Sequence, residues 1–215
     1  LLTFIAIVRS GKAKRKGMVW PSFSLGLGII AQAIIGGISV LTNLNPWVVG
    51  LHFIVSSVLI SIASILVWRF YKPEHQPVPY SVYLLTPWIA LSGIVALVVG
   101  VVVTGAGPHA GDANSPRNGL DLEIWQHLHS YPGYLSIALT FVTLLLLVRV
   151  NKLNAVSLST KVTFWLFIAL AVQAIIGIAQ SRMGVPPMLV GLHMLGASLI
   201  ASLLTFQWLS VRARS

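Results

Sequence analysis

The chain has 215 residues, of which 56% are hydrophobic and only 8% are charged, whereas about a quarter of the residues are charged in a soluble domain. This composition excludes an ordinary water-soluble protein and predicts an integral membrane protein. The formal net charge is +10 and there is no cysteine, which excludes disulfides, iron–sulfur clusters and thiolate-bound haem.

Six apolar runs follow one another along the chain, each long enough to cross a bilayer, which takes roughly 20 residues of helix. In order they lie at about 20–41, 47–68, 81–104, 125–148, 162–180 and 188–209. Before them, LLTFIAIV at residues 1–8 has the composition of a span end, and the chain starts with Leu1 rather than Met. The basic run at residues 9–16 follows this stretch, whereas a signal peptide carries its charges first. We therefore expect six complete spans and the end of a seventh, with an N-terminal part missing from the sequence.

Basic residues gather on one side of these spans. Twelve of the fourteen share that side, and only Arg117 and Arg182 lie on the other. By the positive-inside rule the crowded side is cytoplasmic. Because the charges lie in short loops between spans, the net charge does not predict nucleic-acid binding. Tryptophans near the span ends have the distribution of an aromatic belt. We expect a multi-pass protein of the cell membrane, that of a bacterium.

The longest outer loop, residues 104–123, reads TGAGPHAGDANSPRNGLDLE. Its Gly, Pro and Asn residues favour turns, and no Gly-Lys-Ser/Thr follows to make a phosphate-binding loop. We expect it to cover the mouth of the bundle, with His109 and Asp112 either near a site or only shaping turns. His75, in a Pro-rich cytoplasmic loop, is expected to be solvated.

We expect all acidic residues to lie in loops outside the predicted spans. The chain has only four of them: Glu74, Asp112, Asp121 and Glu123. No carboxylate is therefore predicted within a span. This argues against a proton-coupled transporter and against a carboxylate-bridged di-iron enzyme, because both use carboxylates inside the membrane or bundle.

One pair of sequence motifs occurs twice in the chain. QAIIG at residues 32–36 is followed by VGLH ending at His52, and QAIIG at residues 173–177 is followed by VGLH ending at His193. Aligning residues 31–52 with 172–193 needs no gap and gives ten identities in 22 positions. The pattern predicts a parallel internal duplication with an offset of 141 residues.

The duplication predicts two tandem halves, each an up-and-down four-helix bundle. Residues 1–75 would be the remainder of the N-terminal half, and residues 76–215 the C-terminal half. The repeated glutamines, Gln32 and Gln173, have two interpretations. Each forms a hydrogen bond either between helices or to a ligand.

Three histidines lie about five residues inside the outer ends of separate spans: His52, His129 and His193. At 1.5 Å per residue they share a depth of roughly 7 to 9 Å. An ionisable residue within a span indicates function, and two imidazoles facing across a bundle suit axial ligation of haem. The alternative is a packed histidine bonded to a nearby carbonyl. Repetition in register and equal depth favour metal ligands.

His127 competes with His129, since residues two apart on a helix point about 200° from each other. His129 is deeper in the span, so we expect it to face His193 and His127 to lie near the interface. The partner of His52 would lie before Leu1. Arg117 and Arg182 are candidates for haem propionates, because Arg matches carboxylates in bidentate fashion.

Taken together, TGAGPHAGD after a span, the two QAIIG…VGLH copies and the His at the mouth of the next span resemble the heme A synthase family. The resemblance covers essentially the whole chain. It implies eight helices in two halves, with haem b held by His129 and His193 and the substrate haem received at His52. Many members carry a cysteine pair in an outer loop, which this chain lacks.

The resemblance implies oxidation of a methyl group of haem O to the formyl group of haem A, with electrons entering through haem b. The implied partners are haem O, membrane lipid and an electron donor, and heme O synthase and a second copy of the chain stay open. As written, the chain would bind haem in its C-terminal half without turning over.

Two other function classes compete with this enzyme. A non-catalytic di-haem electron carrier of the cytochrome b type would show much the same histidines. It would hold two permanent haems, whereas a synthase exchanges one. A transporter also fits duplicated halves, but repeated outer histidines and the lack of a membrane acid argue against it.

Overall fold

The computed structural model describes residues 5, 16–71, 73, 77–108, 114–150 and 157–212. Within these ranges every regular element is an α-helix, and six helices are long and apolar enough to cross a membrane. They are α2 (Lys16–Leu41), α3 (Pro46–Tyr71), α4 (Tyr80–Ala106), α5 (Leu122–Val150), α6 (Leu158–Arg182) and α7 (Pro187–Arg212). The prediction of an all-α fold is confirmed, and so is that of six apolar helices long enough to span a membrane.

The helices begin and end at residues suited to those positions. Pro46 and Pro187 each open a helix, where the missing N–H costs nothing and the fixed φ fits the first turn. Ser157 caps α6 by accepting a hydrogen bond from Thr160 N at 3.2 Å. The α2–α3 turn passes through Asn43 and Leu44, whose φ angles are 53° and 56°. These turns are short, so consecutive helices run antiparallel.

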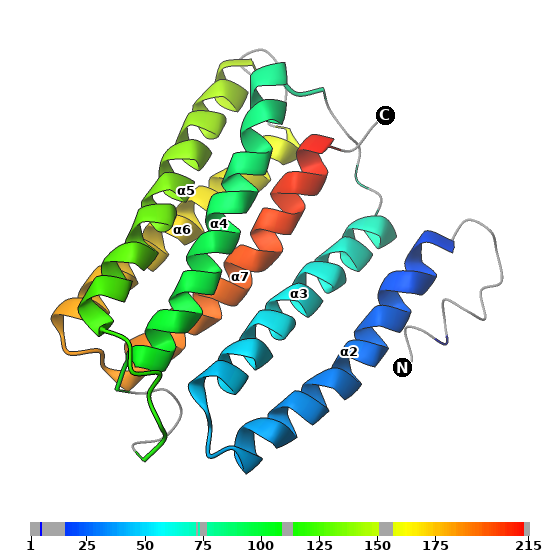
Figure 1. Cartoon of the computed structure of the whole chain (residues 1–215). Helices are drawn as coiled ribbons and strands as arrows, with labels where there is room; N and C mark the ends of the chain where they lie inside the picture. Colours follow the sequence, from blue (N-terminus) through cyan, green and yellow to red (C-terminus); the bar gives the residue numbers. More distant parts are fainter. Residues whose placement is uncertain are drawn as a thin grey trace.

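Four helices pack as a closed ring. α4 contacts α5 and α7, and α6 contacts α5 and α7, while α3 lies against α4 and α7 and carries α2 on its other side. Figure 1 shows α2 and α3 as a hairpin beside this ring. The prediction that the protein consists of two matched four-helix bundles, divided near residue 75, stays a prediction.

The two ends of the molecule differ in charge. We call the end that holds Arg69, Arg149, Lys161 and Arg212 the basic end; each lies in the first or last turn of its helix. The α2–α3, α4–α5 and α6–α7 connections lie at the opposite end, the turn end (Figure 1). At the basic end the Arg212 guanidinium lies over the rings of Tyr83 and Trp208, 4.5 Å and 4.2 Å from their centroids. Cation–π contact therefore joins α7 to α4 there.

The interior of the ring contains two apolar clusters. Nearest the basic end lie Val82, Leu147 and Val211. Farther in lie Ile89, Leu166 and Leu170. Most other large apolar side chains are exposed on the outside of the helices, as expected for surfaces that face lipid rather than water.

Candidate functional site: a facing pair of imidazoles

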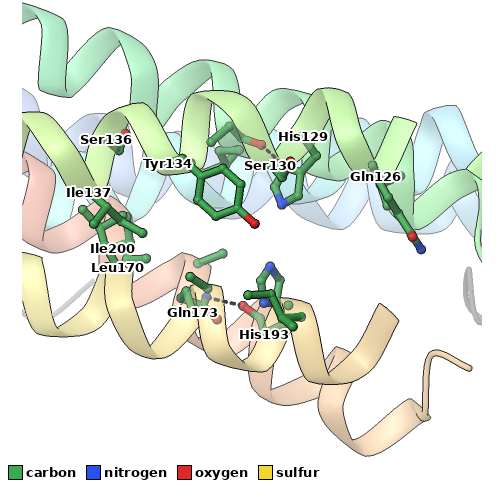
Figure 2. Close-up of a pocket in the computed structure, with 18 of the residues that line it drawn as sticks. Gln126, His129, Ser130, Tyr134, Ser136, Ile137, Leu170, Gln173, His193 and Ile200 are labelled. Carbon is green, nitrogen blue, oxygen red and sulfur yellow. Dashed lines mark hydrogen bonds between the residues drawn. The ribbon is translucent and has the colours of Figure 1, made fainter. Parts of the chain in front are cut away.

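His129 on α5 and His193 on α7 face each other across the interior of the ring. Their ring centroids are 6.0 Å apart and the ring planes are inclined at 71°. Figure 2 shows the two imidazoles pointing toward one another from opposite sides of a cavity. The sequence expectation that His129 faces His193 agrees with this contact, and their depth in a membrane stays a prediction.

The orientation of His129 is fixed by α4. Its Nδ1 is 2.9 Å from the carbonyl oxygen of Ala96, one turn before Gly100. A carbonyl only accepts, so this bond places the proton on Nδ1 and leaves Nε2 as the lone-pair nitrogen. A Cβ atom at Gly100 would lie 2.8 Å from His129 Cε1. Glycine at this position gives the ring its room.

The QAIIG repeat provides the support for His193. Gln173 Nε2 donates to the carbonyl oxygen of His193 at 2.7 Å. Four residues on, a Cβ atom at Gly177 would be 3.4 Å from His193 Cε1. The glutamine thus holds the main chain of α7 and the glycine leaves space for the imidazole.

The first copy of the repeat builds the same arrangement between α2 and α3. Gln32 Nε2 donates to the carbonyl oxygen of His52 at 3.1 Å, and a Cβ atom at Gly36 would lie 3.5 Å from His52 Cε1. Gln32 also donates to the Ser56 hydroxyl, a position occupied by Ala197 in the second copy. Of the two interpretations of the glutamines, the structure contains the hydrogen bond between helices.

Both copies leave the same atoms without a protein partner. The Nδ1 atoms of His52 and His193 and the Oε1 atoms of Gln32 and Gln173 are buried and make no hydrogen bond with any residue that the structure describes. Buried polar atoms of this kind ordinarily meet water or a ligand.

Two cavities meet at the imidazole pair. The larger, of about 280 Å³, lies among α4, α5, α6 and α7. The smaller, of about 100 Å³, lies among α3, α4 and α7 and reaches Gln180 on α6. His129 and His193 line both, so the smaller cavity extends the space beside the pair toward α3.

The other predicted ligands lie elsewhere. His52 packs against Gly36 of α2 and lines neither of the two cavities, so it is not brought to the His129–His193 pair. His127 is exposed, and its Nδ1 is 2.8 Å from the Glu123 carbonyl oxygen on its own helix. His127 lines the larger cavity only at the turn end.

The two predicted propionate partners lie near the turn end and line neither cavity. The Arg117 guanidinium donates to the carbonyl oxygens of Ser115 and Pro108 at 3.1 Å and 2.5 Å and thereby shapes its own loop. Arg182 is the last residue of α6 and is exposed. His75, His109 and Asp112 lie outside the residues that the structure describes.

Sequence reasoning missed the groups that position His129 and the loop beside it. Neither the carbonyl of Ala96 nor the space at Gly100 has a sequence signature. Asn118 donates from Nδ2 to the Val102 carbonyl at 2.8 Å, and its N–H donates to the Gly105 carbonyl at 3.0 Å. It thereby pins the loop before α5 onto the end of α4. The signal for it was an Asn in a Gly- and Pro-rich run.

Within the described ranges, no group of three or more His, Cys, Asp or Glu side chains is placed to hold a metal ion. Comparison of the chain with protein-family models, curated proteins and solved structures finds no match. The candidate site therefore rests on the geometry of His129, His193 and the cavities between them.

Proposed function

We propose that this chain is a membrane oxidoreductase of the heme A synthase type, which oxidises a methyl group of haem O to the formyl group of haem A. His129 and His193 are proposed as the residues that would hold the iron of a haem b cofactor. The observation that carries the proposal is the pair of imidazoles facing each other, with centroids 6.0 Å apart, across a cavity in a helical ring.

The donor set suits a metal that brings its own equatorial ligands. An ion held between two imidazole nitrogens at about 2 Å from each places the ring centroids roughly 6 Å apart. Only two nitrogens converge here, and the described part of the chain adds no third donor. A porphyrin would bring its own nitrogen ligands to the iron, so the protein would need to add only two histidines, as in haem proteins with bis-His ligation.

The chain's own groups would hold and orient the cofactor. The Ala96 carbonyl fixes the tautomer of His129, Gln173 fixes the backbone at His193, and Gly100 and Gly177 leave room for the rings. The bound haem supplies the redox chemistry. Small and apolar residues around the pair, such as Gly93, Ala96 and Ala197, would exclude bulk water.

His52 is proposed as the catalytic residue that ligates the substrate haem O. It repeats the Gln and Gly surroundings of His193, which supports a second haem-binding position. The same likeness favours one other candidate, a di-haem electron carrier with two permanent haems. Arg117 and Arg182 stay the proposed propionate partners.

We further propose that the basic end faces the cytoplasm of a bacterium and that the histidines lie near the outer face of its plasma membrane. The grouping of Arg69, Arg149, Lys161 and Arg212 at one end supports this orientation. An electron donor, heme O synthase and a second copy of the chain are the proposed protein partners.

The first experiment is a reduced-minus-oxidised spectrum and a pyridine haemochrome of the purified chain from haem-supplied cells. We expect low-spin b-type haem that is lost in His129→Ala and in His193→Ala. His127→Ala, two residues away and bonded to its own helix, is the matched control and should retain the haem. A folded wild-type chain without haem would refute the ligand assignment.

The second experiment separates the enzyme from the electron carrier. Because the chain as written is expected not to turn over, cells that make haem O express a version extended by the expected N-terminal part, as wild type or as His52→Ala, and extracted haems are separated chromatographically. A synthase converts haem O to haem A, and His52→Ala abolishes the conversion while retaining haem b. Two permanent b-type haems with no haem A would identify the carrier.

A further inference from the structure

A column of buried polar side chains runs through the ring of α4, α5, α6 and α7. Its members are at most 5% exposed, and all of them are uncharged. They are Ser92, Ser136, Thr140, Thr86, Thr143, Thr163, Gln207, Ser159, Thr160 and Ser210. We call this set the polar column. It starts at the larger cavity, which Ser136 lines, and reaches the first turn of α6 at the basic end.

The middle of the column takes one residue from each helix of the ring. Counted from the helix ends at the basic end, Thr86, Thr143, Thr163 and Gln207 all lie about 7 to 11 Å deep, at 1.5 Å per residue. Gln207 Nε2 donates to Thr86 Oγ1 at 3.4 Å. This polar layer lies between the two apolar clusters.

Three hydroxyls in the column have no partner. Within the described part of the chain, the Oγ1 atoms of Thr140, Thr143 and Thr163 are buried without a hydrogen bond, and the three residues are 0% exposed. A helical threonine can bond to its own helix, as Thr86 does to the Val82 carbonyl at 2.9 Å. The three unpartnered hydroxyls do not, so they are left without compensation in a dry core.

We propose that the polar column binds a file of water molecules that connects the larger cavity with the basic end. Water fits this lining because a hydroxyl both donates and accepts, and the column offers no charge to hold an ion. A buried water needs two to four polar partners, which four converging helices supply.

The column also provides a way past both apolar clusters. Beside the inner cluster of Ile89, Leu166 and Leu170, the α5 face that carries Ser136, Thr140 and Thr143 continues the polar lining at helical spacing. Beside the cluster nearest the basic end, α6 and α7 provide Ser159 and Ser210. Ser159 Oγ donates to the Ser210 carbonyl oxygen at 2.9 Å. The path is a property of the ring and does not depend on which ligand occupies the cavity.

Hydroxyl-radical footprinting by X-ray pulses tests this inference on the full chain in detergent. Radicals formed from a bound water oxidise adjacent side chains, so Leu166, which is 0% exposed, should be labelled despite its burial. After brief mixing with ¹⁸O-water, the label should carry ¹⁸O. Absence of labelling at Leu166 overturns the proposal, because it means that no water lies beside this side chain. Label without ¹⁸O also overturns it, because it means that water inside the ring does not exchange with bulk water.

Valine substitutions give an independent readout, since valine keeps the shape of threonine without its hydroxyl. If water pairs the hydroxyls, Thr143→Val and Thr163→Val lower Tm and the double variant loses the labelling of Leu166. Thr205→Val is the control, because Thr205 bonds to the Ala201 carbonyl of its own helix at 2.8 Å, and it should retain the labelling. A rise in Tm for Thr143→Val and Thr163→Val overturns the proposal.

Discussion

Single residues set the geometry of the imidazole pair, and glycine is the most demanding of them. The His129 ring bonds to the Ala96 carbonyl of α4 and fits against α4 because Gly100 has no side chain. Neither feature is a side chain that could be recognised as functional. The consequence is that the site depends as much on the closeness of α4 to α5 as on the histidines.

We expect Gly100→Ala to displace His129, since the added Cβ would lie 2.8 Å from its Cε1. Overpacking of this kind costs about 1 to 3 kcal/mol. Thermal unfolding and haem content measure it. Gly26→Ala on α2 is the control, because no described atom lies within 4 Å of a Cβ there and Gly26 lines neither cavity, and it should gain about 0.5 to 1 kcal/mol of helix stability. Equal behaviour of the two variants would contradict the close packing.

The two glutamines allow a comparison within one chain. Gln173→Met and Gln32→Met each remove a hydrogen bond to a histidine carbonyl, at a cost of about 0.5 to 1.5 kcal/mol in unfolding free energy. Only Gln173→Met should also weaken haem b binding, because His193 lines the cavities and His52 does not. Haem content and Tm of both variants test this. Equal loss of haem b in Gln32→Met would show that the two halves are coupled.

At the scale of the helices, the sequence predicted that each helix exists better than it predicted where each helix begins and ends. The predicted run at 162–180 corresponds to α6 at Leu158–Arg182, and the run at 125–148 to α5 at Leu122–Val150. Apolar runs mark the part of a helix that crosses lipid. Helices continue beyond it to their polar ends; α6 begins at Leu158, directly after Ser157, whose hydroxyl caps the helix.

The sequence also predicted that His129 would face His193, because both lie about five residues inside spans that begin at the same end, and equal depth then follows from simple counting. It could not identify the polar column. Thr86, Thr143, Thr163 and Gln207 are scattered over four apolar runs, and only packing brings them to one level. Likewise, which carbonyl of α4 meets His129 depends on the angle and rotation of two helices.

The contact between α3 and the ring includes one hydrogen bond between side chains. Ser64 Oγ on α3 and Ser202 Oγ on α7 are 2.8 Å apart. We expect a double-mutant cycle with Ser64→Ala and Ser202→Ala to give a coupling energy of about 0.6 kcal/mol, typical of such bonds in membranes. Unfolding in mixed micelles measures it. Ser57 and Ser198 bond to carbonyls of their own helices, at 3.0 Å and 3.2 Å, and should show no coupling.

At the scale of the whole molecule, the ring is closed and the α2–α3 hairpin is peripheral. α4, α5, α6 and α7 each contact two neighbours in the ring. We therefore expect a fragment of residues 76–215 to insert, to retain its helix content by circular dichroism and to bind haem b. The full chain is its reference. A fragment that unfolds, or that loses haem while the full chain retains it, would show that α3 is part of the site.

The lengths of the helices make the protein sensitive to the thickness of its bilayer. The six helices have 25 to 29 residues, or about 37 to 44 Å at 1.5 Å per residue, against roughly 30 Å of hydrocarbon in a typical membrane. The excess must be taken up by tilt or by helix ends in the headgroup region. Because His129 and His193 lie on different helices, tilting the ring by lipid choice changes the depth of the pair below the headgroups. Short-chain lipids would thereby bring the cavity mouth closer to water, and long-chain lipids would seal it.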